Sequence, residues 1–121
     1  MKRFLTSIAR GDIETVSGLL EHLNFINKKG QTALHLAISE DESKMVQYLI
    51  DQGADIRIQE KKNGFTPLMV CLVEQPVNFM GMIEMILRAP FVDESLSLQD
   101  KTGMLAIHHA ARKDNLSALS L

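Results

Sequence analysis

The stretch Gly30-Gln-Thr-Ala-Leu-His-Leu-Ala37 decides the fold, because the chain contains two further copies of it. The later copies are Gly64-Phe-Thr-Pro-Leu-Met-Val-Cys71 and Gly103-Met-Leu-Ala-Ile-His-His-Ala110, and each one opens with Gly and reaches a small residue seven positions later. The opening glycines are 34 and 39 residues apart. Self-similarity at such a period is typical of proteins built from stacked structural repeats.

The residues around each copy predict a turn followed by a helix. Polar runs precede all three opening glycines, and glycine readily adopts the positive φ that a chain reversal needs. Thr32 and Thr66 stand where a helix N-cap belongs, and Pro67 suits the first helical position. Helices are therefore predicted to begin near residues 32 and 66.

A pair of amphipathic helices is predicted after Thr32. Apolar residues recur there at spacings of three and four on both sides of the polar run 39–43. These apolar residues are Leu34, Ala37, Ile38, Met45, Val46, Leu49 and Ile50. Gly53 is placed to end the second helix in the left-handed conformation. Ala37, Cys71 and Ala110 occupy equivalent places, where small side chains let neighbouring helices approach closely.

These phrases resemble the ankyrin repeat, whose pattern is a Gly turn, Thr-Pro-Leu-His and Ala in an inner helix, and an outer helix closed by Gly-Ala-Asp. The match is most specific over 30–55. The resemblance implies an all-α, helix-turn-helix repeat solenoid with short β-hairpin or turn fingers. A tetratricopeptide array has a similar period, but the Trp and Tyr that it expects at fixed offsets are absent.

The resemblance covers nearly the whole chain as one domain of about four units, at 1–26, 27–59, 60–99 and 100–121. The third unit has a longer segment between its helices, at 74–78, and a longer connection to Asp100, since Pro76 and Pro90 both interrupt a helix. Leu105 replaces the capping Thr of the fourth unit. That unit ends before its second helix is complete, so we expect the sequence to be the N-terminal fragment of a longer protein; the alternative is that a short final helix caps the stack.

Composition and charge exclude several classes of protein. The chain has 121 residues, a formal charge of -2 and one cysteine, so it is neither a disulfide-stapled secreted domain nor a strongly basic nucleic-acid binder. Neither a signal peptide nor an apolar run long enough to span a membrane is evident. We therefore expect a cytoplasmic, monomeric protein.

The candidate reactive residues favour structural roles. His35 and His108 match the family's histidine, which bonds to a neighbouring turn, and His22 has no partner in the sequence. Adjacent residues on a helix point about 100° apart, so His108 and His109 are a poor metal pair. Cys71 lies between Val70 and Leu72, which indicates a buried thiol. No phosphate-binding loop occurs. The sequence thus predicts no catalytic, cofactor-binding or metal-binding residue, no small-molecule substrate and no enzyme.

The resemblance implies that a partner protein meets the finger tips and the exposed side of the inner helices. Carried onto this chain, that face comprises Arg10, Lys28, Lys29, Gln31, Ser39, Glu40, Lys62, Asn63, Phe65, Val73, Glu74, Lys101, Thr102, Met104, Arg112 and Lys113. Phe65 and Met104 are the predicted apolar anchors. Lysines recur at the finger tips and predict a basic ridge for an acidic surface or peptide. The alternative is that they only keep the tips soluble.

The leading hypothesis is therefore a non-enzymatic protein-binding scaffold or adaptor. A second hypothesis is that the stack positions or recruits substrates for a larger multidomain regulator or bacterial effector, whose enzymatic or targeting part lies beyond residue 121. Binding of the basic ridge to nucleic acid or anionic lipid is the weakest hypothesis, since the net charge is -2 and stacking aromatics are scarce.

Overall fold

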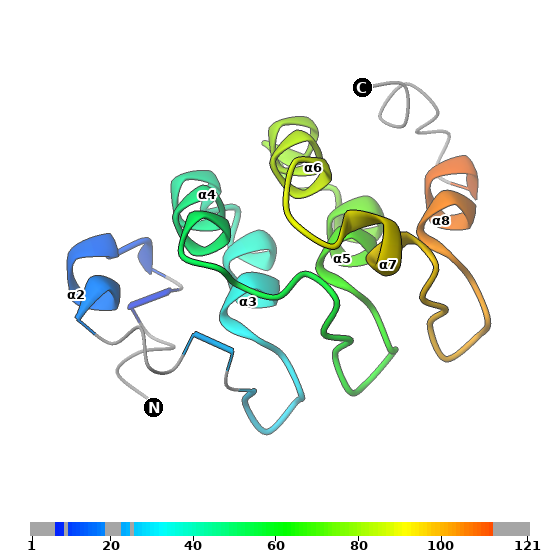
Figure 1. The fold of residues 1–121 in the computed structure, drawn as a ribbon, viewed down its shortest axis with the longest axis horizontal. Helices are drawn as coiled ribbons and strands as arrows, with labels where there is room; N and C mark the ends of the chain where they lie inside the picture. The colour runs from blue at the N-terminus through cyan, green and yellow to red at the C-terminus, as the bar shows by residue number, and fades with distance from the viewer. Residues whose placement is uncertain (1–6, 9, 19–22, 25, 113–121) are drawn as a thin grey trace.

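The computed structural model describes residues 7–8, 10–18, 23–24 and 26–112. Its helices stand side by side in a row, with three finger-like loops projecting from one edge (Figure 1). In chain order the helices are α2 (Ile13–Ser17), α3 (Ala33–Ser39), α4 (Ser43–Asp51), α5 (Pro67–Glu74), α6 (Phe79–Leu87), α7 (Val92–Leu96) and α8 (Ala106–Arg112). No strand occurs within these described residues, so the predicted all-α repeat fold is confirmed.

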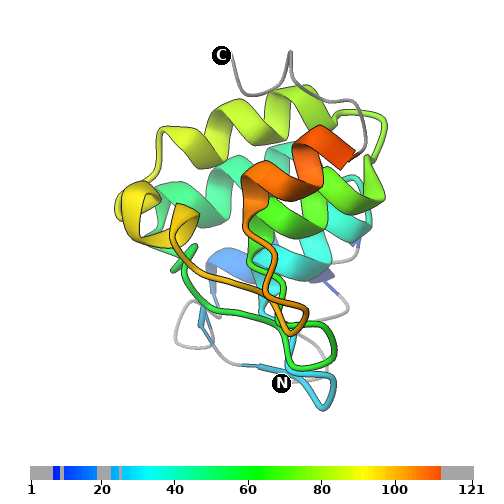
Figure 2. The same ribbon diagram turned by 90° about the vertical axis from the view of Figure 1, so that its right-hand side faces the viewer.

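The helices form two rows. Helices α3, α5 and α8 contact one another in sequence and form the inner row, next to the fingers, while α4 and α6 pack behind α3 and α5 as the outer row. Figure 2 shows the three fingers stacked beneath the helices in the same order. Because α3, α5 and α8 each follow one copy of the repeated phrase, the layers correspond to the repeats in the sequence.

Capping residues fix where the inner helices begin. The hydroxyl of Thr32 accepts from His35 N–H, and His35 Nδ1 accepts from Thr32 N–H at 3.1 Å, which completes a capping box. Thr66 caps α5 by accepting from Met69 N–H at 3.3 Å, and Pro67 is the first residue of that helix. Helix α8 has Leu105 before its first residue and retains only half of the box, in which His108 Nδ1 accepts from Leu105 N–H at 2.9 Å. The predicted helix starts are confirmed.

A continuous apolar layer joins the repeats. It runs from Ile8 to Ala110 and includes Leu34, Ile38, Met45, Leu49, Leu68, Leu72, Met82 and Ile83. Complete burial of one such side chain stabilises the fold by about 1.5–3 kcal/mol. The equivalent small residues Ala37, Cys71 and Ala110 have no exposed surface, as expected for places where helices approach closely.

The connection after α6 contains an extra helix that the sequence analysis did not predict. Helix α7 occupies part of the long segment that was expected only as a connection. Ser95 on its buried side donates to the Ile56 carbonyl at 3.3 Å. Arg57 holds its other side by donating to Glu94 at 2.9 Å and by lying 4.0 Å above the ring of Phe91. The segment 92–96 of the third unit is therefore attached to the end of the second unit.

Candidate interaction surface

Each finger is closed by the same set of hydrogen bonds. We name the fingers by their first residue: the Asn27 finger (27–31), the Glu60 finger (60–65) and the Asp100 finger (100–104). In each, the first residue's N–H donates to the carbonyl of the last residue, at 2.9, 2.8 and 2.9 Å respectively. A side-chain oxygen of the same first residue accepts two backbone N–H groups from within the finger. One polar residue thus fixes the shape of each loop.

Positive φ angles complete the fingers. Gly30, Gly64 and Gly103 have φ of 77°, 74° and 83°, which confirms the turn prediction. A side chain at Gly30 would meet the backbone nitrogen of Lys61 at 2.6 Å, so the Asn27 finger lies directly against the Glu60 finger. The next pair is joined by a hydrogen bond from Lys101 N–H to the Asn63 carbonyl at 3.0 Å. Neighbouring fingers therefore stack in register.

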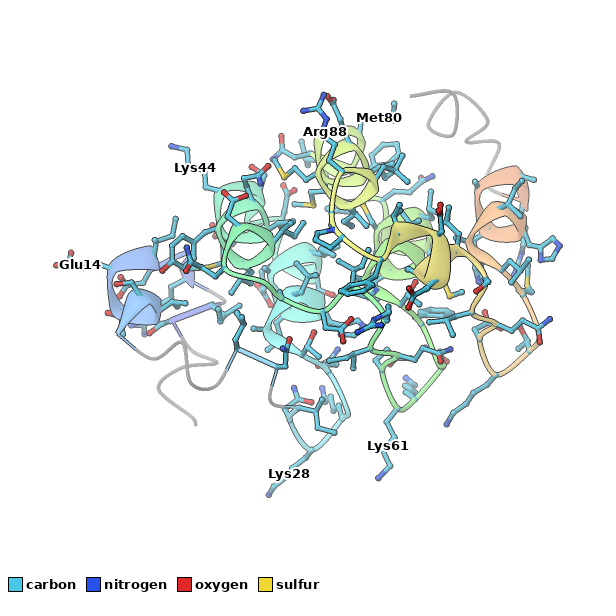
Figure 3. All side chains as sticks on the ribbon, in the orientation of Figure 1. Glu14, Lys28, Lys44, Lys61, Met80 and Arg88 are labelled. Atoms are coloured by element: carbon cyan, nitrogen blue, oxygen red, sulfur yellow. The ribbon has the colours of Figure 1, made fainter. Side chains whose placement is uncertain are left out.

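Exposed lysines occupy the finger tips. They are Lys28, Lys29, Lys61, Lys62 and Lys101. Figure 3 shows Lys28 and Lys61 projecting away from the helices, whereas Lys44 and Arg88 lie at the opposite edge of the molecule. The acidic residues that begin two of the fingers, Glu60 and Asp100, are each only 7% exposed. The finger edge therefore presents positive charge to solvent, although the whole chain carries a net negative charge.

His35 connects one unit to the finger of the next. Since its Nδ1 accepts from Thr32, its Nε2 carries the proton and donates to the Phe65 carbonyl at 3.0 Å. Burial lowers the pKa of His35, and this outweighs the opposite effects of the Phe65 hydrogen bond and the Glu60 charge. The neutral imidazole thus acts as a structural link, as expected for this residue.

His109 forms a second buried link that the sequence analysis missed. Its Nε2 donates to Asp100 Oδ2 at 2.7 Å, and its ring packs edge to face with the Phe65 ring, with the two ring centroids 5.3 Å apart. Burial of Asp100 opposes its ionisation, but hydrogen bonds from Thr102, Met104 and His109 outweigh that effect and lower the pKa of Asp100. The Asp100 finger is therefore attached to α8 by an ionised carboxylate.

A hollow of about 140 Å³ opens between the Glu60 and Asp100 fingers. Phe65 and His109 contribute rings to its lining, and Lys62, Lys101 and Arg112 contribute positive charge. Arg112 donates to the sulfur of Met104 at 3.6 Å, so its guanidinium lies close to the Asp100 finger. This hollow contains polar, charged and aromatic groups within the predicted partner-binding face.

Comparison with known proteins decides the family. A family model described as ankyrin repeats, with three copies, matches residues 4–89. The chain belongs to the ankyrin repeat family. The part that forms the Asp100 finger and α8 lies beyond the matched residues, yet it continues the ankyrin stack by packing against α5.

Several ankyrin relatives are similar to this chain. A probable 26S proteasome regulatory subunit p28 from Saccharomyces cerevisiae is 31% identical over 105 residues, covering 83% of this chain and 43% of the relative. NF-kappa-B inhibitor alpha from Homo sapiens is 27% identical over 109 residues, covering 90% of this chain and 34% of the relative. Ankyrin repeat protein 14 from Vaccinia virus is 33% identical over 55 residues, covering 46% of this chain and 23% of the relative. The chain therefore spans less than half the length of each of these proteins.

Most of the predicted ankyrin binding residues lie on the finger edge or on the exposed side of the inner helices. The exposed ones are Arg10, Lys28, Lys29, Ser39, Glu40, Lys62, Asn63, Glu74, Lys101, Thr102 and Arg112. Those that are half-buried are Gln31, Phe65, Val73 and Met104. Lys113 lies outside the described residues.

The structure brings only some of these residues together. Lys62, Asn63, Phe65, Lys101, Thr102 and Arg112 all line the hollow. Ser39 donates to Glu74 at 3.3 Å, where α3 and α5 end. Arg10 precedes α2 in the chain, and α2 stands at the opposite end of the row from α8.

The reactive groups of this ankyrin stack are buried or dispersed. Burial raises the pKa of the Cys71 thiol to about 12, with smaller contributions from the charges of Asp41 and Glu74, so the thiol is protonated and a poor nucleophile. Among the residues that the structure describes, no three His, Cys, Asp or Glu side chains are grouped to hold a metal ion. None of the helices described here has the length and apolar character to cross a bilayer.

Proposed function

We propose that this ankyrin chain is a monomeric scaffold that binds a partner protein through the tips of its fingers and the exposed side of α3, α5 and α8. The observation that carries the proposal is the row of three fingers, each closed by the same hydrogen bonds and held in register with the next. Because these loops are ordered before a partner arrives, association does not incur the entropy loss of ordering them.

The charges of the finger edge indicate what the partner offers. The tip lysines are exposed, while the carboxylates of Glu60 and Asp100 accept hydrogen bonds from within their fingers and, for Asp100, also from His109 of α8. An acidic segment or surface on the partner would be attracted to this edge and orientated by it. The names of two relatives agree with a role in contacting other proteins, since one is a regulatory subunit and the other an inhibitor of NF-kappa-B.

A comparison of two charge-reversal variants tests this proposal. Lys28→Glu with Lys61→Glu changes the finger tips, and Lys44→Glu with Arg88→Glu changes the opposite edge by the same total charge. Proteins retained by the immobilised wild-type chain from an extract of its source cells are quantified by mass spectrometry. The tip variant should lose the specific partners that the control variant keeps, with both variants folded by circular dichroism. Equal retention by the two variants would refute the binding face.

A second role is favoured by the lengths of the relatives. This chain spans 43% of the yeast relative and 34% of the human one, so both relatives extend well beyond a stack of this length. In this role the ankyrin stack recruits a substrate for an enzymatic or targeting domain of a longer regulator. The complete reading frame of the source gene tests this role, because it shows whether a further domain is present. If that domain acts on a bound substrate only when the finger lysines are intact, the role is supported. If substitution of the lysines leaves that action unchanged, the role is contradicted.

A further inference from the structure

The hollow between the Glu60 and Asp100 fingers contains groups that the other repeats lack. The place of His109 in the repeated phrase is taken by Leu36 in the second unit and Val70 in the third. The place of Arg112 is taken by Ser39 and Val73. Of the three units that carry the repeated phrase, only the fourth has an imidazole and a guanidinium at these two places.

The charge available in the hollow is positive. Lys62, Lys101 and Arg112 are exposed, and within the part of the chain that the structure describes none of them forms an ion pair. Asp100 also lines the hollow, but its side chain is 1% exposed and its oxygens accept from Thr102, Met104 and His109. Only weak hydrogen bonding to a thioether holds the Arg112 guanidinium at Met104, so it is free to exchange that acceptor for a stronger one.

The size and lining of the hollow favour a single side chain. Its volume of about 140 Å³ is below the range of roughly 300–1,000 Å³ that is usual for small-molecule pockets. The half-buried Phe65 ring, packed edge to face with the buried His109 ring, offers an apolar surface for methylene groups. A guanidinium and two ammonium groups beside that surface suit a planar carboxylate, which an arginine can bind through two parallel hydrogen bonds.

We propose that this hollow is a subsite for a glutamate or aspartate side chain of an extended partner segment, held by Arg112, Lys62 and Lys101. The subsite rests on the proposed function and makes it more specific, because it selects the gap between the third and fourth units rather than the whole row of lysines. The partner backbone crosses the finger edge, and one acidic side chain enters the hollow.

Binding of a fluorescein-labelled octaglutamate peptide tests the subsite. Fluorescence anisotropy is measured at low ionic strength on the whole chain, because added salt screens such contacts. Three variants each lose two positive charges: Lys62→Gln with Arg112→Gln in the hollow, Lys28→Gln with Lys29→Gln in the Asn27 finger, and Lys44→Gln with Arg88→Gln at the opposite edge. Circular dichroism confirms that each variant is folded.

The hollow variant should bind octaglutamate about three- to tenfold more weakly than the wild-type chain, as expected when two exposed charge contacts are lost. The other two variants should change affinity less than the hollow variant does. In addition, the peptide should shift the backbone amide resonances of Lys101 and Thr102 more than those of Lys28 and Lys29. This combination supports the subsite.

Two outcomes would overturn it. If the Asn27-finger variant weakens binding as much as the hollow variant, the lysines act as a uniform ridge and no subsite exists. If wild-type protein does not bind octaglutamate, the hollow does not accept a carboxylate. Neither outcome bears on the proposed function. That function is tested separately, by comparing the partner proteins retained by the finger-tip variant and by its control.

Discussion

His109 Nε2 lies 2.7 Å from Asp100 Oδ2, and the two side chains are only 5% and 1% exposed. A buried carboxylate with this partner is favourable only while its hydrogen bonds are complete, because each unsatisfied buried polar group destabilises the fold by about 1–3 kcal/mol. The pair therefore holds the Asp100 finger against α8. The contribution of each residue to stability depends on the presence of the other.

A double-mutant cycle measures this dependence. His109→Leu introduces the residue found at the equivalent Leu36 and should lower the free energy of unfolding by about 1–3 kcal/mol, since it leaves Asp100 Oδ2 without its partner. Asp100→Asn keeps an oxygen for the finger, as Asn27 does. The double variant should be less destabilised than the sum of the single variants, in urea unfolding curves. Additive effects would show that the pair is not coupled.

The stability of the chain should fall in mildly acidic solution. The pKa of His35 is lowered in the folded state, so the unfolded chain binds more protons as pH decreases from about 6.5 and stability decreases with it. Above that pH the effect is absent. Thermal unfolding at a series of pH values should show a flatter dependence in this range for His35→Gln than for the wild-type chain. An equal slope in both would contradict the prediction.

A second pH window belongs to Asp100. Its pKa is lowered by folding, so the stability that it contributes is complete above about 3.8 and is lost as pH falls below that value. The Asp100→Asn variant should therefore be less stable than the wild-type chain near neutral pH but less sensitive to acid below 3.8. Acid titration followed by circular dichroism checks both statements.

Two glycine substitutions separate backbone strain from contact between fingers. Gly30 and Gly103 both have positive φ, so alanine at either position strains the backbone by roughly 1 kcal/mol. A Cβ at Gly30 would also press on Lys61, whereas one at Gly103 would meet nothing within 4 Å among the described atoms. Gly30→Ala should therefore be clearly more destabilising than Gly103→Ala in urea unfolding. Equal effects would mean that the fingers are not packed together in solution.

The Cys71 thiol should resist labelling until the chain unfolds. It is fully buried, its pKa is raised to about 12, and its Sγ–H donates to the Phe79 carbonyl at 3.4 Å. A chromogenic disulfide reagent should react slowly with the native protein in mildly alkaline buffer and rapidly in concentrated guanidinium. Fast reaction of the native protein would contradict the burial of this residue.

Phe91 offers a test of the attachment of α7. Its φ of 67° is unusual for a residue with a side chain, and its ring lies under the Arg57 guanidinium. Phe91→Ala should destabilise the fold by about 0.5–1 kcal/mol through loss of the cation–π contact. Phe91→Gly loses the same contact, but glycine adopts a positive φ without strain. It should therefore be less destabilising than Phe91→Ala, as measured by urea unfolding. A more damaging Gly variant would show that the backbone at 91 is unstrained.

The repeated phrase predicts the inner helices well because their boundaries depend on local chemistry. Thr32, Thr66 and Pro67 act within one turn of their own helices, and the resulting hydrogen bonds are those that the sequence indicates. Helix α7 escaped prediction because what stabilises it lies far away in the sequence. Arg57 and the Ile56 carbonyl bind it from the preceding unit, and no periodic pattern within 92–96 reveals that contact.

The candidate surface was predicted less completely. The lysine tips follow from their place in the repeat, whereas the contact of the half-buried Phe65 ring with His109 does not. Taken only as the neighbour of His108, His109 gives no indication of the hollow. An alignment of the units shows His109 in the place of Leu36 and Val70, and a polar residue at an otherwise apolar place is the signal that points to a buried partner.

The hydrogen bond from His35 to the Phe65 carbonyl has a consequence for how such a protein diversifies. It joins an imidazole to a backbone oxygen, so it does not depend on which side chains stand at the loop apex. Selection can therefore exchange the residues that a binding partner reads while the distance from one loop to the next stays the same. At this link, the atoms that set the spacing between loops are therefore separate from the apex side chains that a partner contacts.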